Sequence, residues 1–319
     1  MNNELSKVEE LALSIATCIE IKTACHDKSH PCNLVVMDQE ALGTEFRQSP
    51  EPWAGNLEKA KLLFVSSNPS ISSEDITGEN FPKVQFNSAE ANHPEWPTEK
   101  IIDFHVNRFD QNREKPYVRA KPMAQYLCKD GEYRGKDGFK PGQQNQKFWT
   151  DVFNLSKFIY NAEIDISNDV CLTEVVHCKS RTEDNFVKSA MPRCSGNYLE
   201  RTLALSGSIL VVCYGAAARD YFVHSELNDI EVDIDPVNFG FFSKTGPGLY
   251  HLGVLTCNGQ KRIFCALKHS NGRGGGKTFT NALGAELAKE LANLFNSIVK
   301  GSESVPETRE ALFKKLLVR

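Results

Sequence analysis

Apolar and polar residues along the chain follow two periods, one typical of helices and one typical of buried strands. Residues 4–25 place apolar side chains at helical spacing. Leu62 to Val65 is a short apolar run, typical of a parallel strand buried on both faces. Further patterns alternate along the chain: a helix from Phe148, a strand over 170–176, a helix near 197–205, a strand over 208–214 and a helix from Gly215. Alternating strands and helices predict a largely parallel sheet covered on both faces.

The last third of the chain predicts a hairpin followed by two helices. Asn258-Gly259 suits a tight turn between apolar runs at 250–256 and 261–267. Helical spacing returns at about 278–298 and 306–317.

The stretch from about residue 84 to residue 146 differs from the rest of the chain. It is polar, rich in turn residues and poor in long apolar runs. Such a stretch predicts an insertion or an elaborate surface loop and not a second core.

The composition is that of a soluble globular protein, with 40% hydrophobic and 24% charged residues in 319. No run approaches the ~18 apolar residues of a membrane helix, and the N-terminus lacks the layout of a signal peptide. We therefore expect a cytoplasmic protein, without a membrane partner and monomeric. Ten cysteines in such a chain predict buried apolar residues or metal and cluster ligands, and no disulfide framework. The formal charge of −4 argues against a non-specific nucleic-acid coat, although local basic patches can bind DNA.

Two polar turns follow predicted strands and carry the candidate chemistry. Ser67-Asn68-Pro69-Ser70 follows the strand at 62–65, and Lys268-His269-Ser270-Asn271 follows the strand at 261–267. In open α/β sheets, ligands bind at the edge where parallel strands end. An Asn-Pro dipeptide by itself is equally typical of an ordinary turn.

These turns resemble two motifs of the uracil-DNA glycosylase superfamily. Ser67-Asn68-Pro69-Ser70 resembles the first motif of its mismatch-specific branch, and His269-Ser270-Asn271 resembles the second motif, His-Pro-Ser, with Ser in place of Pro. Glu79-Asn-Phe81-Pro resembles the segment whose Phe stacks on the flipped base. The resemblance covers roughly residues 25–280 in the family's order, apart from the insertion. It implies a three-layer α/β/α sandwich with a mainly parallel central sheet.

The resemblance also implies an activity, monofunctional base excision from double-stranded DNA by hydrolysis. Asn68 would position the water, His269 would stabilise the leaving base and Phe81 would stack on it. Base-binding roles would extend to the neighbours of Asn68, namely Ser67, Pro69 and Ser70. Phe81 is as typical of a core aromatic as of a stacking residue.

Glu174 departs from the family pattern, because the iron–sulfur branch has an Asn there that reads uracil. An ionised Glu only accepts hydrogen bonds, so it would repel a uracil keto oxygen and accept from the exocyclic amine of cytosine. We therefore expect a modified cytosine as substrate. The superfamily includes bacterial enzymes that act in defence on modified phage bases, and such a role suits this expectation. The alternative for Glu174 is an ion pair with a nearby Lys or Arg.

The cysteines resemble the ligands of the iron–sulfur branch. Cys178 and Cys194 have the spacing of its last two ligands, and Cys25 and Cys32 precede the first strand as the other two should, although at a wider spacing. The resemblance implies a [4Fe-4S] cluster of structural role. Zinc is the alternative metal, and Cys18 the alternative to Cys25. Four further cysteines lie in or beside predicted strands and are expected to be buried apolar residues: Cys171, Cys213, Cys257 and Cys265.

The glycine-rich stretch from Asn271 to Thr278 nearly matches a phosphate-binding loop. Asn271 stands where that loop requires its first Gly, and too little chain follows for the rest of an NTPase. In the glycosylase interpretation this loop contacts DNA. Its candidate DNA-binding residues are Ser270, Asn271, Arg273, Gly274 and Lys277. The alternative is a solvated surface loop.

The sequence thus predicts an N-terminal helix and cluster-ligand segment at 1–58, a glycosylase α/β domain at 59–300 with the insertion at 84–146, and a helical tail at 301–319. Two other functions stay open: excision of plain uracil in repair, and a non-catalytic sensor of modified DNA.

Overall fold

The computed structural model describes residues 4–38, 50–69, 98–106, 126–127, 133–134, 147–180, 185–224, 230–234, 250–267 and 279–317. The chain forms two compact units. The first comprises Met1–Gly55, Ser67–Asn145 and Thr173–Leu205, and the second comprises Asn56–Ser66, Gln146–Leu172 and Ser206–Arg319.

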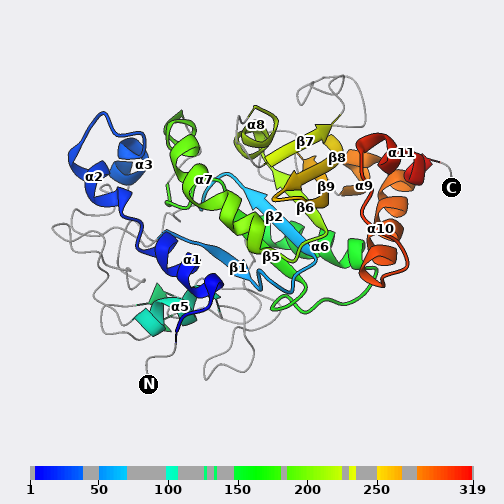
Figure 1. The fold of residues 1–319 in the computed structure, drawn as a ribbon, viewed down its shortest axis with the longest axis horizontal. Coiled ribbons are helices and arrows are strands. Elements are labelled where there is room, and N and C mark those ends of the chain that lie inside the picture. Colours follow the sequence, from blue (N-terminus) through cyan, green and yellow to red (C-terminus); the bar gives the residue numbers. More distant parts are fainter. Residues whose placement is uncertain are drawn as a thin grey trace. The chain divides into compact units, whose positions relative to one another are not determined.

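The described residues form both helices and strands, labelled in Figure 1. The helices are α1 (Lys7–Ala16), α2 (Glu20–His26), α3 (Asn33–Met37), α5 (Thr98–Val106), α6 (Lys147–Tyr160), α7 (Asn185–Leu205), α8 (Ala216–His224), α9 (Phe279–Leu283), α10 (Ala285–Val299) and α11 (Arg309–Leu317). The strands are β1 (Trp53–Gly55), β2 (Leu62–Ser66), β3 (Tyr126–Leu127), β4 (Tyr133–Arg134), β5 (Val170–Glu174), β6 (Leu210–Tyr214), β7 (Ile230–Ile234), β8 (Tyr250–Cys257) and β9 (Gln260–Leu267). Among these described helices, none is long and apolar enough to cross a membrane.

Seven strands form one sheet in the order β1-β5-β2-β6-β9-β8-β7, and β3 pairs with β4 separately. β6 is parallel to both of its neighbours, with Val212 opposite Phe64 of β2 and Cys265 of β9. β8 is antiparallel to both β9 and β7, and Figure 1 shows these three strands side by side. The chain is therefore of the α/β class, as predicted, with a mixed sheet. All residues of β2, β5 and β6 are buried, the apolar runs as expected and also the polar residues Ser66, Thr173 and Glu174 at strand ends.

The parallel strands of the second unit end at one edge of the sheet. The main-chain N–H of Gly215, just after β6, donates to the carbonyl of Leu267, the last residue of β9. Gly215 has a φ of 96°, which favours glycine at this strand-to-helix turn. β2 runs parallel to β6, and Ser67 and Asn68 follow β2 in the chain.

The predicted hairpin is confirmed. β8 and β9 pair in register from Cys257 opposite Gln260 to Tyr250 opposite Leu267. Asn258 and Gly259 have φ values of 49° and 71°, the left-handed conformations that a two-residue hairpin turn needs.

The expectation of one helix over residues 4–25 is wrong, because the structure has two helices with a break between them. Ser6 caps α1 by a reciprocal capping box with Glu9. The break at residues 17–19 buries Cys18 and leaves Ile19 71% exposed. A continuous amphipathic helix would not turn the Cys18 thiol into the protein while exposing its apolar neighbour, so the break changes which side chain faces inward.

Two other helices also differ from the sequence-based bounds. Where one helix was expected at about 278–298, the structure has α9 and α10, divided at Gly284, whose φ of 84° is outside the helical range. The helix expected near 197–205 begins earlier, at Asn185, and contains Pro192. Its early turns include Cys194, which is buried.

Part of the predicted insertion is core and not surface loop. α5 lies within residues 84–146 and buries Ile101, Ile102 and His105. In the first unit it packs against α1 and β1. The apolar residues of α5 form only a short run within a polar stretch, which is why the sequence did not predict this buried helix.

Candidate functional site

The Asn68 turn is joined to the segment that follows β5 by two main-chain hydrogen bonds. The Val176 N–H donates to the Ser67 carbonyl at 2.9 Å, and the Ser180 N–H donates to the Pro69 carbonyl at 3.1 Å. The ends of β2 and β5 are therefore held together, and residues 176–180 form the segment that contacts the Asn68 turn.

The Asn68 side chain is fixed through its amide nitrogen. Nδ2 donates to the Ser180 hydroxyl at 2.7 Å, to the Pro69 carbonyl at 3.2 Å and to the Cys178 carbonyl at 3.4 Å. Among the described residues, no hydrogen-bond donor is assigned to the Asn68 carbonyl oxygen, and the residue is only half-buried. This oxygen is consequently free to accept a hydrogen bond from a water or a ligand.

Beside Asn68, the Ser67 hydroxyl is a buried polar group. Ser67 is 3% exposed, and its Oγ has no hydrogen-bond partner in the described part of the chain. A buried hydroxyl without a partner is unfavourable by about 1–3 kcal/mol, so a ligand or water at this position would relieve it.

Glu174 is the last residue of β5 and is 5% exposed. The neighbouring Thr173 hydroxyl donates to the Pro52 carbonyl at 2.8 Å. Lys179, in the segment after β5, pairs with Glu51 at 2.7 Å. The structure thus brings Glu174, Ser67, Asn68 and Pro69 to the joined ends of β2 and β5.

Between Glu174 and Cys178, His177 is buried and held in one tautomer. Its Nδ1 donates to the Glu51 carbonyl at 2.7 Å, and its ring meets that of Tyr198 edge-on. Burial lowers the pKa of His177 to about 4. The imidazole is therefore neutral near pH 7 and stabilises the fold without a charge.

A cavity in the first unit brings together four of the cysteines. This thiol cavity is lined by Cys18, Cys32, Cys178 and Cys194, together with Glu20, Arg193, Tyr198 and apolar side chains. The His177 main-chain N–H donates to the Cys194 sulfur at 3.4 Å. Cys25 lies near Cys178 but does not line the cavity.

Burial raises the pKa of every thiol in the cavity. The pKa of Cys32 rises to about 12, the pKa of Cys18 rises, and those of Cys178 and Cys194 rise well above their usual range. Mutual repulsion of the thiolates adds to the effect of burial on Cys32, Cys178 and Cys194. Four thiolates at this site therefore need a cationic centre to balance their charge.

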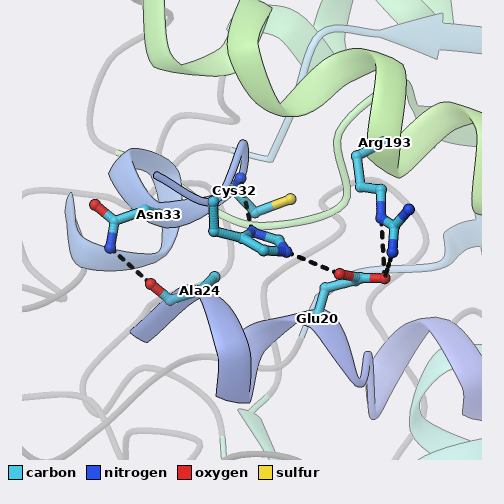
Figure 2. Close-up of polar contacts among 6 residues, drawn as sticks. Glu20, Ala24, Cys32, Asn33 and Arg193 are labelled. Atoms are coloured by element: carbon cyan, nitrogen blue, oxygen red, sulfur yellow. Dashed lines mark hydrogen bonds and ion pairs between the residues drawn. The ribbon is translucent and has the colours of Figure 1, made fainter. Parts of the chain in front are cut away.

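The Glu20 carboxylate, beside the thiol cavity, connects Arg193 to the loop that carries Cys32 (Figure 2). Arg193 donates to Glu20 Oε1 through Nε at 3.0 Å and through Nη2 at 2.7 Å. His30 Nε2 lies 2.9 Å from Glu20 Oε2, and its Nδ1 accepts from the Cys32 N–H at 3.1 Å. The chain of contacts from Arg193 to the Cys32 backbone thus places the Cys32 loop against α7.

Glu20 is ionised in this arrangement. Burial raises the pKa of the Glu20 carboxyl, but the hydrogen bonds from Arg193 and His30 outweigh burial and leave the pKa below its usual range. The Asn33 amide, which donates to the Ala24 carbonyl at 2.6 Å, ties α3 to α2 beside this network.

Replacing Glu20 by Gln is expected to lower the free energy of unfolding at pH 7 by about 2–3 kcal/mol. Gln offers one acceptor for Arg193, but its NH₂ group then faces the His30 Nε2–H, and two donors cannot bond. In the other tautomer of His30, with the proton on Nδ1, the Nδ1–H would instead face the Cys32 N–H, and these two donors could not bond. Urea unfolding of purified variants measures this loss.

Glu163→Gln is the matched control, because Glu163 pairs with Lys157 at 2.5 Å but is 87% exposed. Its loss should be below about 1 kcal/mol. Equal losses in the two variants would contradict a supporting role of Glu20.

Several predicted site residues lie outside the described residues. These are Ser70, Phe81, His269, Ser270, Asn271, Arg273, Gly274 and Lys277. Within the described ranges, no group of three or more His, Cys, Asp or Glu side chains has the arrangement of a metal-ion site. Four cysteines nevertheless line one cavity.

The sequence did not indicate Ser180, Glu20 or Arg193 as site residues. Ser180 and Asn68 are 112 positions apart, and Arg193 and Glu20 are 173 apart. Only the Cys178-Lys-Ser180 spacing after β5 could have suggested that a hydroxyl reaches the same edge as Asn68.

Comparison with known proteins gives no assignment: no protein-family model matches the chain, and no curated protein matches it. The likeness to uracil-DNA glycosylases therefore rests on the short motifs and their order along the chain.

Proposed function

We propose that this protein is a DNA glycosylase that hydrolyses the N-glycosidic bond of a flipped, modified cytosine-type base and leaves an abasic site. The observation that carries the proposal is the fixed Asn68 amide at the end of β2. Three acceptors hold its nitrogen, so its oxygen is the atom that can orient a water. The α/β class of the chain agrees with a three-layer sandwich of the uracil-DNA glycosylase type.

The reaction breaks the bond between sugar C1′ and the base nitrogen. The bonding electrons leave with the base, the water oxygen bonds to C1′, and the departing anionic base takes up the proton that the water gives up. Asn68 Oδ1 orients this water, and His269 donates a hydrogen bond to the keto oxygen of the departing base. No carboxylate stands in the segment 67–70, so stabilisation of the leaving base supplies most of the rate.

Glu174 selects the base in this proposal. Its carboxylate is buried at the end of β5, beside the bond between Val176 and Ser67 that joins β5 to the Asn68 turn. A buried carboxylate accepts from the exocyclic amine of cytosine and repels a uracil keto oxygen. Because ordinary cytosine must be spared, binding also requires a substituent on the base, as expected of a defence enzyme acting on modified phage DNA.

Double-stranded DNA is the partner in this proposal. The target base leaves the stack at a loss of a few kcal/mol, which stacking on Phe81 offsets in part. The segment after β9 contacts the strand: Gly274 allows close approach to phosphates, Arg273 and Lys277 supply positive charge, and Ser270 and Asn271 are further DNA-binding residues.

The cofactor in this proposal is a [4Fe-4S] cluster in the thiol cavity, with zinc as the alternative. The donor set fits, because four buried cysteines from separate segments line one cavity and the His177 N–H already donates to one of the sulfurs. The cluster supplies structural cross-linking when bound, and the base chemistry is carried by side chains.

Replacing Glu174 by Asn is expected to shift the preferred substrate from modified cytosine to uracil. The carboxylate only accepts hydrogen bonds, whereas the amide both donates and accepts. The change should therefore alter discrimination between the two bases by about 1–3 kcal/mol, or roughly 5–150-fold. Alkaline cleavage at abasic sites in duplexes with uracil or glucosylated hydroxymethylcytosine measures it. Glu231→Asn, at an exposed position of β7, is the control. Unchanged preference in Glu174→Asn would contradict the selective role of Glu174.

A further inference from the structure

Five cysteines gather in the first unit, one more than a cluster with four thiolate ligands needs. Cys18, Cys25, Cys32 and Cys194 each act electrostatically on Cys178. Only Cys18, Cys32, Cys178 and Cys194 line the thiol cavity. The choice between Cys18 and Cys25 therefore decides the ligand set.

The Cys18 sulfur has the surroundings of a metal-bound thiolate. The Tyr198 hydroxyl, a hydrogen-bond donor, lies beside its sulfur in the thiol cavity. Donors of this kind stabilise negative charge on sulfur and tune clusters and metal sites. Tyr198 comes from α7, which also carries Cys194, so the same helix supports both sulfurs.

Cys18 lies in the break between α1 and α2 and lines the cavity. The helix breaks at residues 17–19, where Cys18 is 6% exposed and its neighbour Ile19 is 71% exposed. Exposing a large apolar side chain is unfavourable by roughly 1.5–3 kcal/mol relative to burying it, and burial of the thiol in its place indicates a use for the thiol.

Cys25 has a different position. It lies inside α2, is half-buried and does not line the cavity. The two cysteines are seven residues apart, so the chain offers both, but only one contacts the shared space.

We propose that Cys18, Cys32, Cys178 and Cys194 are the four ligands and that Cys25 is not a ligand. The assignment rests on the proposed cofactor and does not depend on the glycosylase reaction.

The test compares Cys18→Ser with Cys25→Ser in the full-length protein purified without oxygen. Iron and acid-labile sulfide per chain are measured, together with the visible absorption spectrum. Cys18→Ser is expected to hold roughly 10-fold less iron or to show a shifted spectrum, while Cys25→Ser matches the unsubstituted protein. Loss of iron in Cys25→Ser with a normal Cys18→Ser would overturn the assignment.

Tyr198→Phe provides a second readout should Cys18→Ser fail to fold. It removes the hydroxyl that lies beside Cys18 and keeps the ring against His177. The loaded protein is expected to keep its iron, and its reduction potential should fall because one donor to a ligand sulfur is lost. An unchanged potential would mean that Cys18 is not bound to the cluster.

The outcomes also separate this assignment from the proposed function. If the iron-loaded protein releases no base from any DNA, the ligand assignment stands and the glycosylase proposal is wrong. If the protein holds zinc instead of iron, and Cys18→Ser loses the zinc while Cys25→Ser keeps it, the four ligands stand and the cofactor is zinc. An unsubstituted protein that holds neither metal overturns both the ligands and the cofactor.

Discussion

Asn68→Ala is expected to slow base release from modified DNA by about 10²–10³-fold, the usual effect of removing one fixed polar group from a transition state. The substitution removes the oxygen proposed to orient the water, while β2 and its register with β6 stay intact. The lost hydrogen bonds of Nδ2 lower the free energy of unfolding by only about 1 kcal/mol each. Single-turnover kinetics on a duplex with one modified cytosine, together with urea unfolding, separate the two effects.

Two further variants make this result specific. Ser180→Ala removes the shortest of the three bonds to Asn68 Nδ2 and leaves those to Pro69 and Cys178, so an intermediate loss of about 10-fold is expected. Asn168→Ala, at an exposed amide bonded to Asp165, should leave the rate unchanged. If Asn68→Ala kept the full rate, Asn68 would not position the water.

Cys178→Ala is expected to release the cluster and lower the free energy of unfolding by about 4–5 kcal/mol or more, as loss of a structural metal does. Cys178 lines the thiol cavity, and its carbonyl accepts from Asn68 at 3.4 Å. Loss of the cluster frees residues 176–180, and with them the Asn68 turn. Base release should therefore fall together with metal content.

The control is Cys265→Ala, because Cys265 is fully buried on β9 but lies outside the thiol cavity. Its loss should be about 1 kcal/mol, with metal content and base release unchanged. Metal analysis and urea unfolding of both variants give the comparison. Equal losses of stability, with no change in metal content, would contradict a cofactor at Cys178.

Local patterns predicted those elements of the fold that depend on local sequence. The apolar run at 62–65 predicted β2, and Asn258-Gly259 predicted the β8–β9 turn, because burial on two faces and left-handed φ values restrict the residues allowed. The break between α1 and α2 was missed, since residues 4–25 keep helical spacing through it. Cys18 lies in this break, where it is buried and lines the thiol cavity with Tyr198, a tertiary arrangement that local spacing does not encode.

The candidate site was predictable to the extent that it lies at strand ends. Asn68 and Glu174 follow or end buried strands, and the structure brings their strand ends together through Val176 and Ser67. Ser180 and the Glu20–Arg193 pair could not be predicted, because their partners are far away in the sequence. Likewise, the sequence left Cys18 and Cys25 as alternatives, and only the cavity distinguishes them.

Mass spectrometry of free bases tests the central claim most directly. The protein is incubated with duplexes that carry uracil, hydroxymethylcytosine, glucosylated hydroxymethylcytosine or ordinary bases alone. The account predicts release of a modified cytosine from the matching duplex, none from ordinary DNA, and none with Asn68→Ala or His269→Ala. Release of uracil alone would contradict the selectivity assigned to Glu174, and tight binding to modified DNA without any released base would contradict the glycosylase itself.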